Sequence, residues 1–333
     1  MASRCVSRFT PTDLVVTLFV ASVVASAMLL PAIARLGSSD GRLRCAANLR
    51  QIGQGIQMYM NENKGAFPRA RFDGAGGEPT EFTGWDAASP FDASGPGPND
   101  VTAAMFLLLR TQDLTSEVFV CPFSQAERWD FAGKAVQDVS NFPGPQYLSY
   151  SLCNPYASPP AAAAGFTLDD AAARSFPPQF AVAADINPGP PDVLTASPNS
   201  PRGTMRLANS RNHDGDGQNV LHADGHVEYH TTPFCGMTRT GSPPYRDNVY
   251  TFGAGYADAP GIGVRGSPAD GLDSVLLPTG LAGPLPPLEG PLASVEPSTW
   301  IMIGLLAAIL LCVSATLVLA LRRNRGVSRS PNS

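Results

Sequence analysis

The chain has 333 residues and a formal net charge of −5, and it contains 32 glycines and 32 prolines. Its basic residues are not gathered into a central patch, which argues against nucleic-acid binding. The high content of glycine and proline predicts long loops and linkers around one compact domain of roughly 200 residues, enough for a hydrophobic core.

Apolar segments stand near both ends of the chain. Residues 14–34 and 299–321 are each long enough to cross a bilayer as a helix. Arginines follow the second segment, so the positive-inside rule places the basic tail 322–333 in the cytoplasm, and two spans then place residues 1–13 there too. This predicts an anchored protein whose main domain lies outside the cytoplasm, which in a bacterium would mean the inner membrane for the anchor and the periplasm or cell surface for the domain. A cleaved secretory signal is the alternative for the first segment.

An amphipathic helix is predicted to follow the first apolar segment. Apolar residues recur at alternating spacings of three and four, which is typical of one buried helical stripe. The stripe consists of Cys45, Leu49, Ile52, Ile56 and Tyr59. Lys64-Gly65 ends the helical pattern. The favoured interpretation is one long helix with a kink at Pro31, whose second half lies on a globular domain.

The middle of the chain predicts only short elements. A helix is expected at 102–109, and short apolar runs predict strands at 118–121, 147–152 and 180–184. Beyond residue 253 the chain is rich in Pro and Gly and lacks periodicity. We therefore expect an extracytoplasmic domain at 35–253 and a tether to the membrane at 254–298.

The best-defined element is a hairpin at residues 219–230, with an Asp-Gly pair at its centre. Such a pair is typical of a two-residue type I′ turn. That register places His222 on the opposite face from His226 and His230. Because His226 and His230 would also lie about 13 Å apart along their strand, no transition-metal site is expected here.

Four cysteines fall in the predicted outer region, where disulfides are permitted. The disulfide candidates are Cys45, Cys121, Cys153 and Cys235. Four cysteines allow three pairings, and the sequence does not choose between them. There is no CxxC pair, so a zinc site is not expected.

Three stretches resemble the prepilin-like proteins with an H-X9-DG domain, also called DUF1559. The first is Arg8-Phe9-Thr10-Pro11-Thr12-Asp13 with the apolar helix after it, which is similar to a type IV prepilin N-terminus. The second runs from Cys45 to Gly53 and looks like the C-x-N-N-L-K-Q-I-G segment of the family. The third is His213 with the Asp-Gly pair downstream. The matching motif residues are Cys45, Asn48, Leu49, Gln51, Ile52, Gly53, His213, Asp224 and Gly225.

The resemblance implies a pilin-like α+β fold. Its long N-terminal helix, transmembrane in its first half, would pack on a small antiparallel sheet with long loops, and a second transmembrane helix would follow at the C-terminus. It also implies a non-catalytic structural, secretion or cell-envelope role, with partners among other pseudopilin or type II secretion subunits. The prepilin processing positions would be Arg8, Phe9 and Asp13, although Arg8 stands where the family usually has Gly. Residues 295–300 resemble the start of a PEP-CTERM sorting signal, and an ordinary second anchor is the alternative.

One loop has the alternating oxygen-bearing residues with which a calcium loop begins: Asn212, Asp214, Asp216 and Gln218. The bidentate Glu that would close such a loop is absent, and the alternative is a turn leading into the hairpin. Calcium is the one cofactor that the sequence suggests, and a cell-surface calcium- or ligand-binding module is the alternative function. No Gly-x-Ser-x-Gly, HExxH or P-loop motif is present, so we expect no enzyme.

Overall fold

The computed structural model describes residues 11–169, 177–241, 243–253 and 261–281. The chain divides into two compact units, one of residues 40–286 and one of residues 1–39 with 287–333. The described sheets and core lie in the first of these units.

Helix α1 (Pro11–Glu62) is 52 residues long and runs through the predicted kink position. The other described helices are short: α2 (Val101–Thr111), α3 (Pro159–Ala163) and α5 (Arg202–Ala208), with 3-10 turns η1 (Ser116–Phe119), η2 (Phe131–Gly133), η3 (Val136–Asp138), η4 (Pro145–Tyr147), η5 (Asp192–Thr195) and η6 (Arg211–His213). The described strands are β1 (Tyr150–Cys153), β2 (Ala181–Asp185), β3 (Gln218–His222), β4 (Val227–His230), β5 (Phe234–Arg239), β6 (Tyr245–Asn248) and β7 (Leu276–Leu277).

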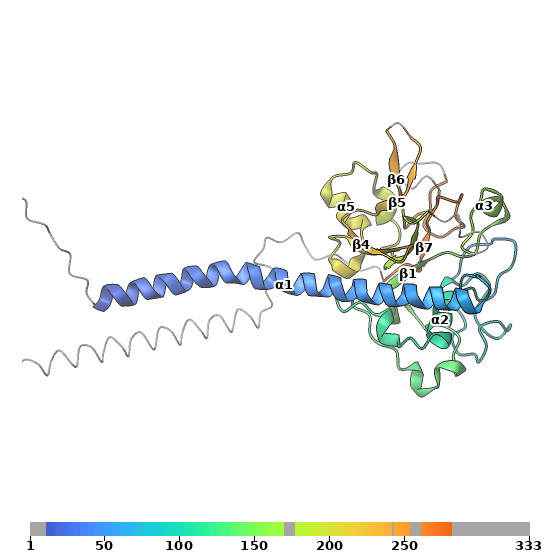
Figure 1. The fold of residues 1–333 in the computed structure, drawn as a ribbon, viewed down its shortest axis with the longest axis horizontal. Helices are drawn as coiled ribbons and strands as arrows, with labels where there is room; N and C mark the ends of the chain where they lie inside the picture. The colour runs from blue at the N-terminus through green and yellow to red at the C-terminus, as the bar shows by residue number, and fades with distance from the viewer. Residues whose placement is uncertain (1–10, 170–176, 242, 254–260, 282–333) are drawn as a thin grey trace, which may run out of the picture. The chain divides into compact units, whose positions relative to one another are not determined.

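The structure is an α+β fold in which the described strands form a five-stranded antiparallel sheet, in the order β4-β3-β2-β1-β7, and a β5-β6 pair (Figure 1). Tyr150 of β1 lies opposite Asp185 of β2, and Ala184 lies opposite Val220 of β3. Every residue of β1, β2 and β3 is buried. This explains why β2 is an almost continuous apolar run, because a strand covered on both faces needs no alternation with polar residues.

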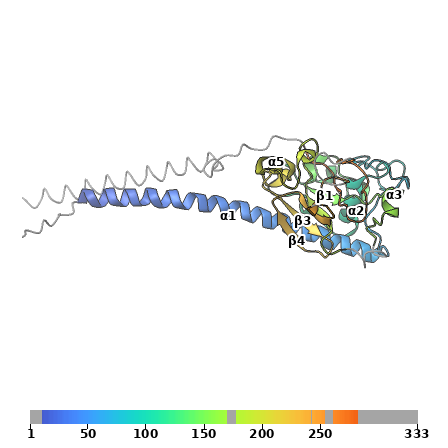
Figure 2. The same ribbon diagram turned by 90° about the horizontal axis from the view of Figure 1, so that it is seen from above.

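The C-terminal half of α1 packs against the sheet through the predicted stripe, which is confirmed: its five side chains are at most 8% exposed. Figure 2 shows β3 and β4 against this part of the helix. Gly53 permits the close approach, because a Cβ there would lie 3.0 Å from both methyl carbons of Leu221. Leu221 therefore marks the sheet face that α1 covers.

The predicted fold class was wrong about the first half of the long N-terminal helix, which was expected to span a membrane. In the part of the chain that the structure describes, no helix is long and apolar enough to cross a membrane. From Gly41 onward, Arg42 and Arg44 interrupt the apolar pattern. The inner-membrane location depended on this span and was wrong with it.

Other predictions fall on residues outside the described ranges. These include the processing positions Arg8 and Phe9, the second apolar segment 299–321 and the sorting signal at 295–300. Asp13 lies within α1, but its side chain is not described.

Two local predictions differ from the structure. Residues 118–121, expected as a strand, begin in the 3-10 turn η1, where the N–H of Val118 donates to the carbonyl of Thr115. A short buried apolar run has no periodicity that distinguishes a strand from a buried turn. The stretch predicted as a tether contributes β7, which pairs with β1.

The hairpin was predicted in the wrong register. Three residues, 223–225, form the loop between the paired residues His222 and His226, and Gly225 among them has a φ of +88°, which suits a type I turn followed by a left-handed Gly. The N–H of His222 donates to the carbonyl of His226 at 2.9 Å. A shift of one residue moves side chains to the other face, so His222 shares a face with His226 and His230.

Candidate functional site

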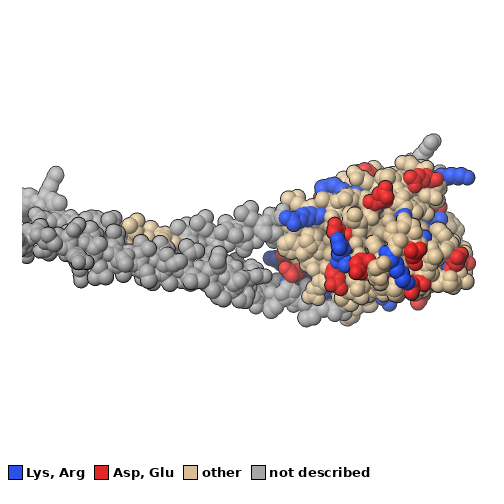
Figure 3. Space-filling model, turned by 90° about the horizontal axis from the view of Figure 1, so that it is seen from below, with Lys and Arg blue, Asp and Glu red and all other residues tan. Residues whose placement is uncertain are grey.

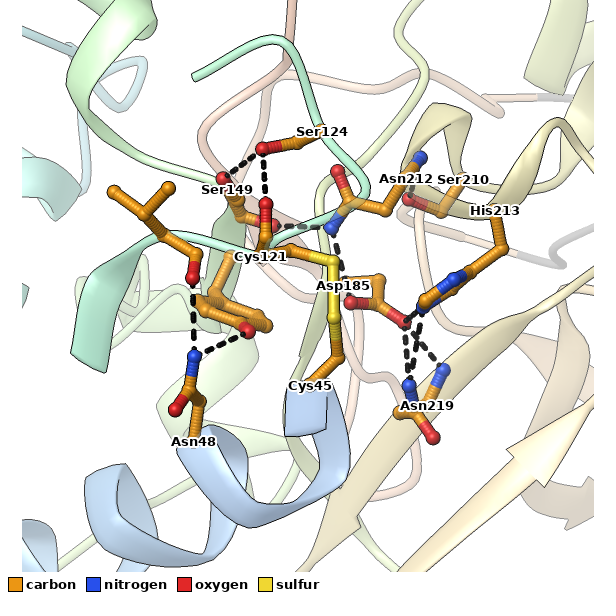
Figure 4. Close-up of a disulfide and its surroundings, with 12 residues drawn as sticks. Cys45, Asn48, Cys121, Ser124, Ser149, Asp185, Ser210, Asn212, His213 and Asn219 are labelled. Atoms are coloured by element: carbon orange, nitrogen blue, oxygen red, sulfur yellow. Dashed lines mark hydrogen bonds and ion pairs between the residues drawn. A yellow bond between two sulfur atoms is a disulfide. The ribbon is translucent and has the colours of Figure 1, made fainter. Parts of the chain in front are cut away.

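A buried disulfide joins α1 to the chain segment that follows η1. Cys45 and Cys121 are 76 residues apart in sequence, 5.3 Å apart at their Cα atoms and fully buried (Figure 4). Cys153 and Cys235 are buried free thiols. The structure therefore contains one of the pairings that the sequence left open.

The Asn48 side chain adds hydrogen bonds beside the disulfide. Its Nδ2 donates to the carbonyl of Val120 at 3.0 Å and to the hydroxyl of Tyr150 at 3.2 Å. Tyr150 is fully buried, and this burial, with a smaller contribution from the nearby Asp185 carboxylate, raises the pKa of its phenol well above the usual value. The residues Cys45 and Asn48 thus fix one turn of α1 to two other parts of the unit.

Asp185, at the end of β2, is the centre of a buried polar cluster next to the disulfide. Its Oδ1 accepts from Asn212 Nδ2 at 2.9 Å. Its Oδ2 accepts from the backbone N–H of Asn219 at 2.6 Å and from Asn219 Nδ2 at 3.0 Å. The side chain is fully buried, so these charge-assisted hydrogen bonds replace the water that the carboxylate loses.

His213 joins the same cluster from η6. Its Nε2 lies 3.1 Å from Asp185 Oδ2 and 3.3 Å from Asn219 Nδ2. Because the Asp185 carboxylate can only accept, we assign the proton to Nε2, which then donates to Asp185 and not to the amide nitrogen of Asn219. The ring lies near Phe123 and Tyr229, with centroids 6.2 and 5.9 Å away. The His213 side chain is 3% exposed and is held on several sides.

The acid–base pair of this cluster is enclosed by its own hydrogen-bond partners. In the described part of the chain, the polar partners of the His213 ring are Asp185 and Asn219, and Asn212 and Asn219 also bond to the Asp185 carboxylate. The nearby hydroxyls of Ser124 and Ser149 bond to each other at 2.7 Å. The arrangement fits a structural lock whose polar groups satisfy one another.

The four residues of the predicted calcium loop do not converge. Asn212 donates inward, to Asp185 and to the carbonyl of Ser149. The Gln218 side-chain oxygen accepts from the Ser210 N–H at 3.2 Å. Asp214 and Asp216 are exposed at the surface.

Asp216 lies beside arginines instead of other oxygen ligands. Its carboxylate is 3.5 Å from Arg42 and 4.0 Å from Arg202. Together with Arg206, these residues line a cavity of about 520 Å³, and the Arg42 guanidinium lies 4.5 Å above the ring of Tyr229. Three cationic side chains at one opening favour an anion over a calcium ion.

The remaining residues of the family-like motifs lie in the core, on the surface of α1 or in the turn of the hairpin. Leu49 and Ile52 are fully buried in the core, whereas Gln51 is exposed on the opposite side of α1. Asp224 and Gly225 form the turn of the hairpin, and the Asp224 carboxylate accepts from the backbone N–H of His226 at 3.0 Å.

The sequence reasoning missed two features of the site. It did not connect Asp185 to His213, which comes 28 residues later, because no local pattern joins an acidic residue at a strand end to a later turn. It also dismissed the hairpin histidines. In the described residues, His222, Glu228 and His230 bring together side-chain atoms that could hold a metal, and so do Cys45, Cys121, Asp185 and His213. In the second group both sulfur atoms are already bonded to each other.

On the face shown in Figure 3, acidic and basic side chains are interspersed over the unit.

Comparisons with protein-family models, curated proteins and solved structures found no match to this chain.

Proposed function

We propose that this chain is a non-catalytic structural protein with a cell-envelope or secretion role, and that it works by assembly, as pseudopilin-type subunits do. The observation that supports this most is how the motif side chains are used. Cys45 and Asn48 fix α1 to the unit, while His213 and Asp185 fix the turn before the hairpin. A reactive site would need these groups to face a substrate, whereas here they bond to one another.

The disulfide supports folding in an oxidising compartment. Cysteine pairs persist as disulfides in secreted and periplasmic proteins and are kept reduced in most cytosols. The bond between Cys45 and Cys121 is fully buried, so it belongs to the structural class and not to the exposed, easily exchanged class.

The exposed side of α1 within residues 40–62 is the surface that we assign to assembly. Leu43 is 66% exposed and Met58 is 49% exposed, and between them the exposed side chains are mainly polar. Scattered exposed apolar residues are common, so the assignment depends on a test.

The test is analytical ultracentrifugation of the oxidised full-length chain over a wide range of concentration, combined with chemical cross-linking. We expect reversible self-association that Leu43→Glu weakens. Phe91→Glu is the matched control, because Phe91 is a 56% exposed apolar residue in a loop and not on α1. A chain that stays monomeric throughout, or that loses association equally in both variants, would contradict the proposal.

A second candidate function is binding of an anionic ligand, and the arginine-lined cavity is the observation that favours it. Calorimetric titration with inorganic phosphate tests it. We expect Arg42→Ala to weaken binding, whereas Arg128→Ala, which removes an exposed arginine paired with Glu117 elsewhere, should leave it unchanged. Equal binding by both variants would remove the cavity from consideration.

A further inference from the structure

Three polar side chains meet on the hairpin formed by β3 and β4, on the sheet face opposite Leu221 and α1. They are His222, Glu228 and His230. One ring nitrogen from each histidine and one carboxylate oxygen all lie within 4.8 Å of one another. Among these atoms, His230 Nε2 and Glu228 Oε2 are 3.5 Å apart.

The lone pair of His222 is available and has no partner. Its Nδ1 lies 2.9 Å from the carbonyl of Gln179, so Nδ1 carries the proton and donates. Nε2 is then an acceptor, yet it is buried and makes no hydrogen bond. The residue is only 2% exposed. A histidine held by a backbone carbonyl on one nitrogen and open on the other is the usual arrangement of a metal ligand.

The second histidine also has an unpartnered ring nitrogen. Nε2 of His230 is also a buried atom with no hydrogen bond, and its side chain is 13% exposed. Two unsatisfied buried nitrogens in one small cluster are uncommon in a folded protein and call for a ligand.

We propose that His222, Glu228 and His230 bind one divalent transition-metal ion of the zinc class between β3 and β4. Two imidazoles and one carboxylate are a donor set that such ions accept, and calcium, which prefers oxygen ligands, would not choose it. Ligand atoms around tetrahedral zinc are about 3.3 Å apart. The His230–Glu228 pair is already near this separation, and a nitrogen of His222 lies within 4.8 Å of both of the other ligand atoms.

The surrounding charges are compatible with a cation. Arg246 lies nearby, but its guanidinium donates to the carbonyls of Cys235 and Gly236. Glu228 supplies the negative charge at the site.

A bound ion would connect the two strands of the hairpin. Strand β4 is at the sheet edge and pairs only with β3 in the described sheet. Metal ligation across the two strands would hold this edge in register and limit its pairing with other chains.

The test measures Zn²⁺ binding to the full-length, untagged chain without reductant, so that Cys45 and Cys121 stay in their disulfide. Competition with a chromophoric chelator gives the affinity, and the absorption of bound Co²⁺ reports tetrahedral ligation. We expect one ion per chain and at least a tenfold weaker affinity in His222→Gln, His230→Gln and Glu228→Gln. Glu228 is 60% exposed at its side chain, so its variant should fold even if a histidine variant does not.

His226→Gln is the matched control. His226 stacks on His222 with ring centroids 4.4 Å apart, but it lies outside the three-residue group. We expect its affinity to remain within about twofold of the unmodified chain. Equal zinc affinity in the unmodified chain and Glu228→Gln would overturn the proposal, as would an equal loss in His226→Gln.

Discussion

Removing the disulfide between Cys45 and Cys121 should destabilise the unit strongly, because it closes a long loop. The two cysteines are separated by 76 residues. In the chain-entropy model, a cross-link over such a loop lowers the entropy of the unfolded chain by about 15 cal/mol/K, which is about 4.5 kcal/mol at 25 °C. The Cys45→Ala/Cys121→Ala chain should therefore lose up to about 4.5 kcal/mol in its free energy of unfolding. Alanine avoids burying a hydroxyl at two fully buried positions.

Urea unfolding followed by tryptophan fluorescence measures this loss. Trp129 is a suitable reporter, because it is 4% exposed and packs edge-on against Trp85 in the core. Reductant should lower the stability of the unmodified chain to that of the double variant and should leave the variant unchanged. If the variant unfolds within about 1 kcal/mol of the oxidised chain, the cross-link does not constrain the unfolded state as we argue.

Three further predictions follow from the same unit. Asp185→Asn keeps the shape of the side chain but points an amide donor at other donors such as Asn219, so calorimetry should show that the free energy of unfolding falls by about 3 kcal/mol. A fall of less than about 1 kcal/mol would exclude the cluster as a lock. Gly53→Leu should overpack against Leu221 and lower the free energy of unfolding in urea by about 1–3 kcal/mol. Gln54→Leu, on the exposed side of the helix, is the control and should be almost neutral. Equal losses in the two variants would refute the close packing. Burial raises the pKa of Asp273 to about 6, so its carboxyl binds a proton more readily in the folded chain than in the unfolded chain. The protonated carboxyl therefore contributes to stability fully below about pH 4, and this contribution is lost as the pH rises through about 6. A carbon-13 titration of this carboxyl tests the shift, and a midpoint below 4 would show the reasoning to be wrong.

Local periodicity predicted much of the fold. The stripe from Cys45 to Tyr59 is buried because helix spacing alone places those residues on one side. The hairpin was placed correctly, but its register was not, because an Asp-Gly pair fits both a two-residue turn and a three-residue loop that ends in a left-handed Gly.

The candidate site depended on contacts between distant residues, which no local pattern records. The Asp185 carboxylate and His213 meet only because β2, β3 and η6 come together in space. The grouping of His222, Glu228 and His230 was missed for a different reason. The single-residue register error placed His222 on the face opposite His230, so the two rings were not expected to lie together.

Strand β7 affects when this unit can fold. It is the last described strand in the chain, yet it forms the edge next to β1, and Leu276 and Leu277 are fully buried in the same core as Cys45. The core therefore joins residues more than 200 positions apart in sequence, which is typical of slow folding. Until residue 277 has left the ribosome, the open side of β1 remains unpaired and can associate with other strands. Folding of this unit is thus completed only after residue 277 has been delivered, and chaperones would be needed most during that interval.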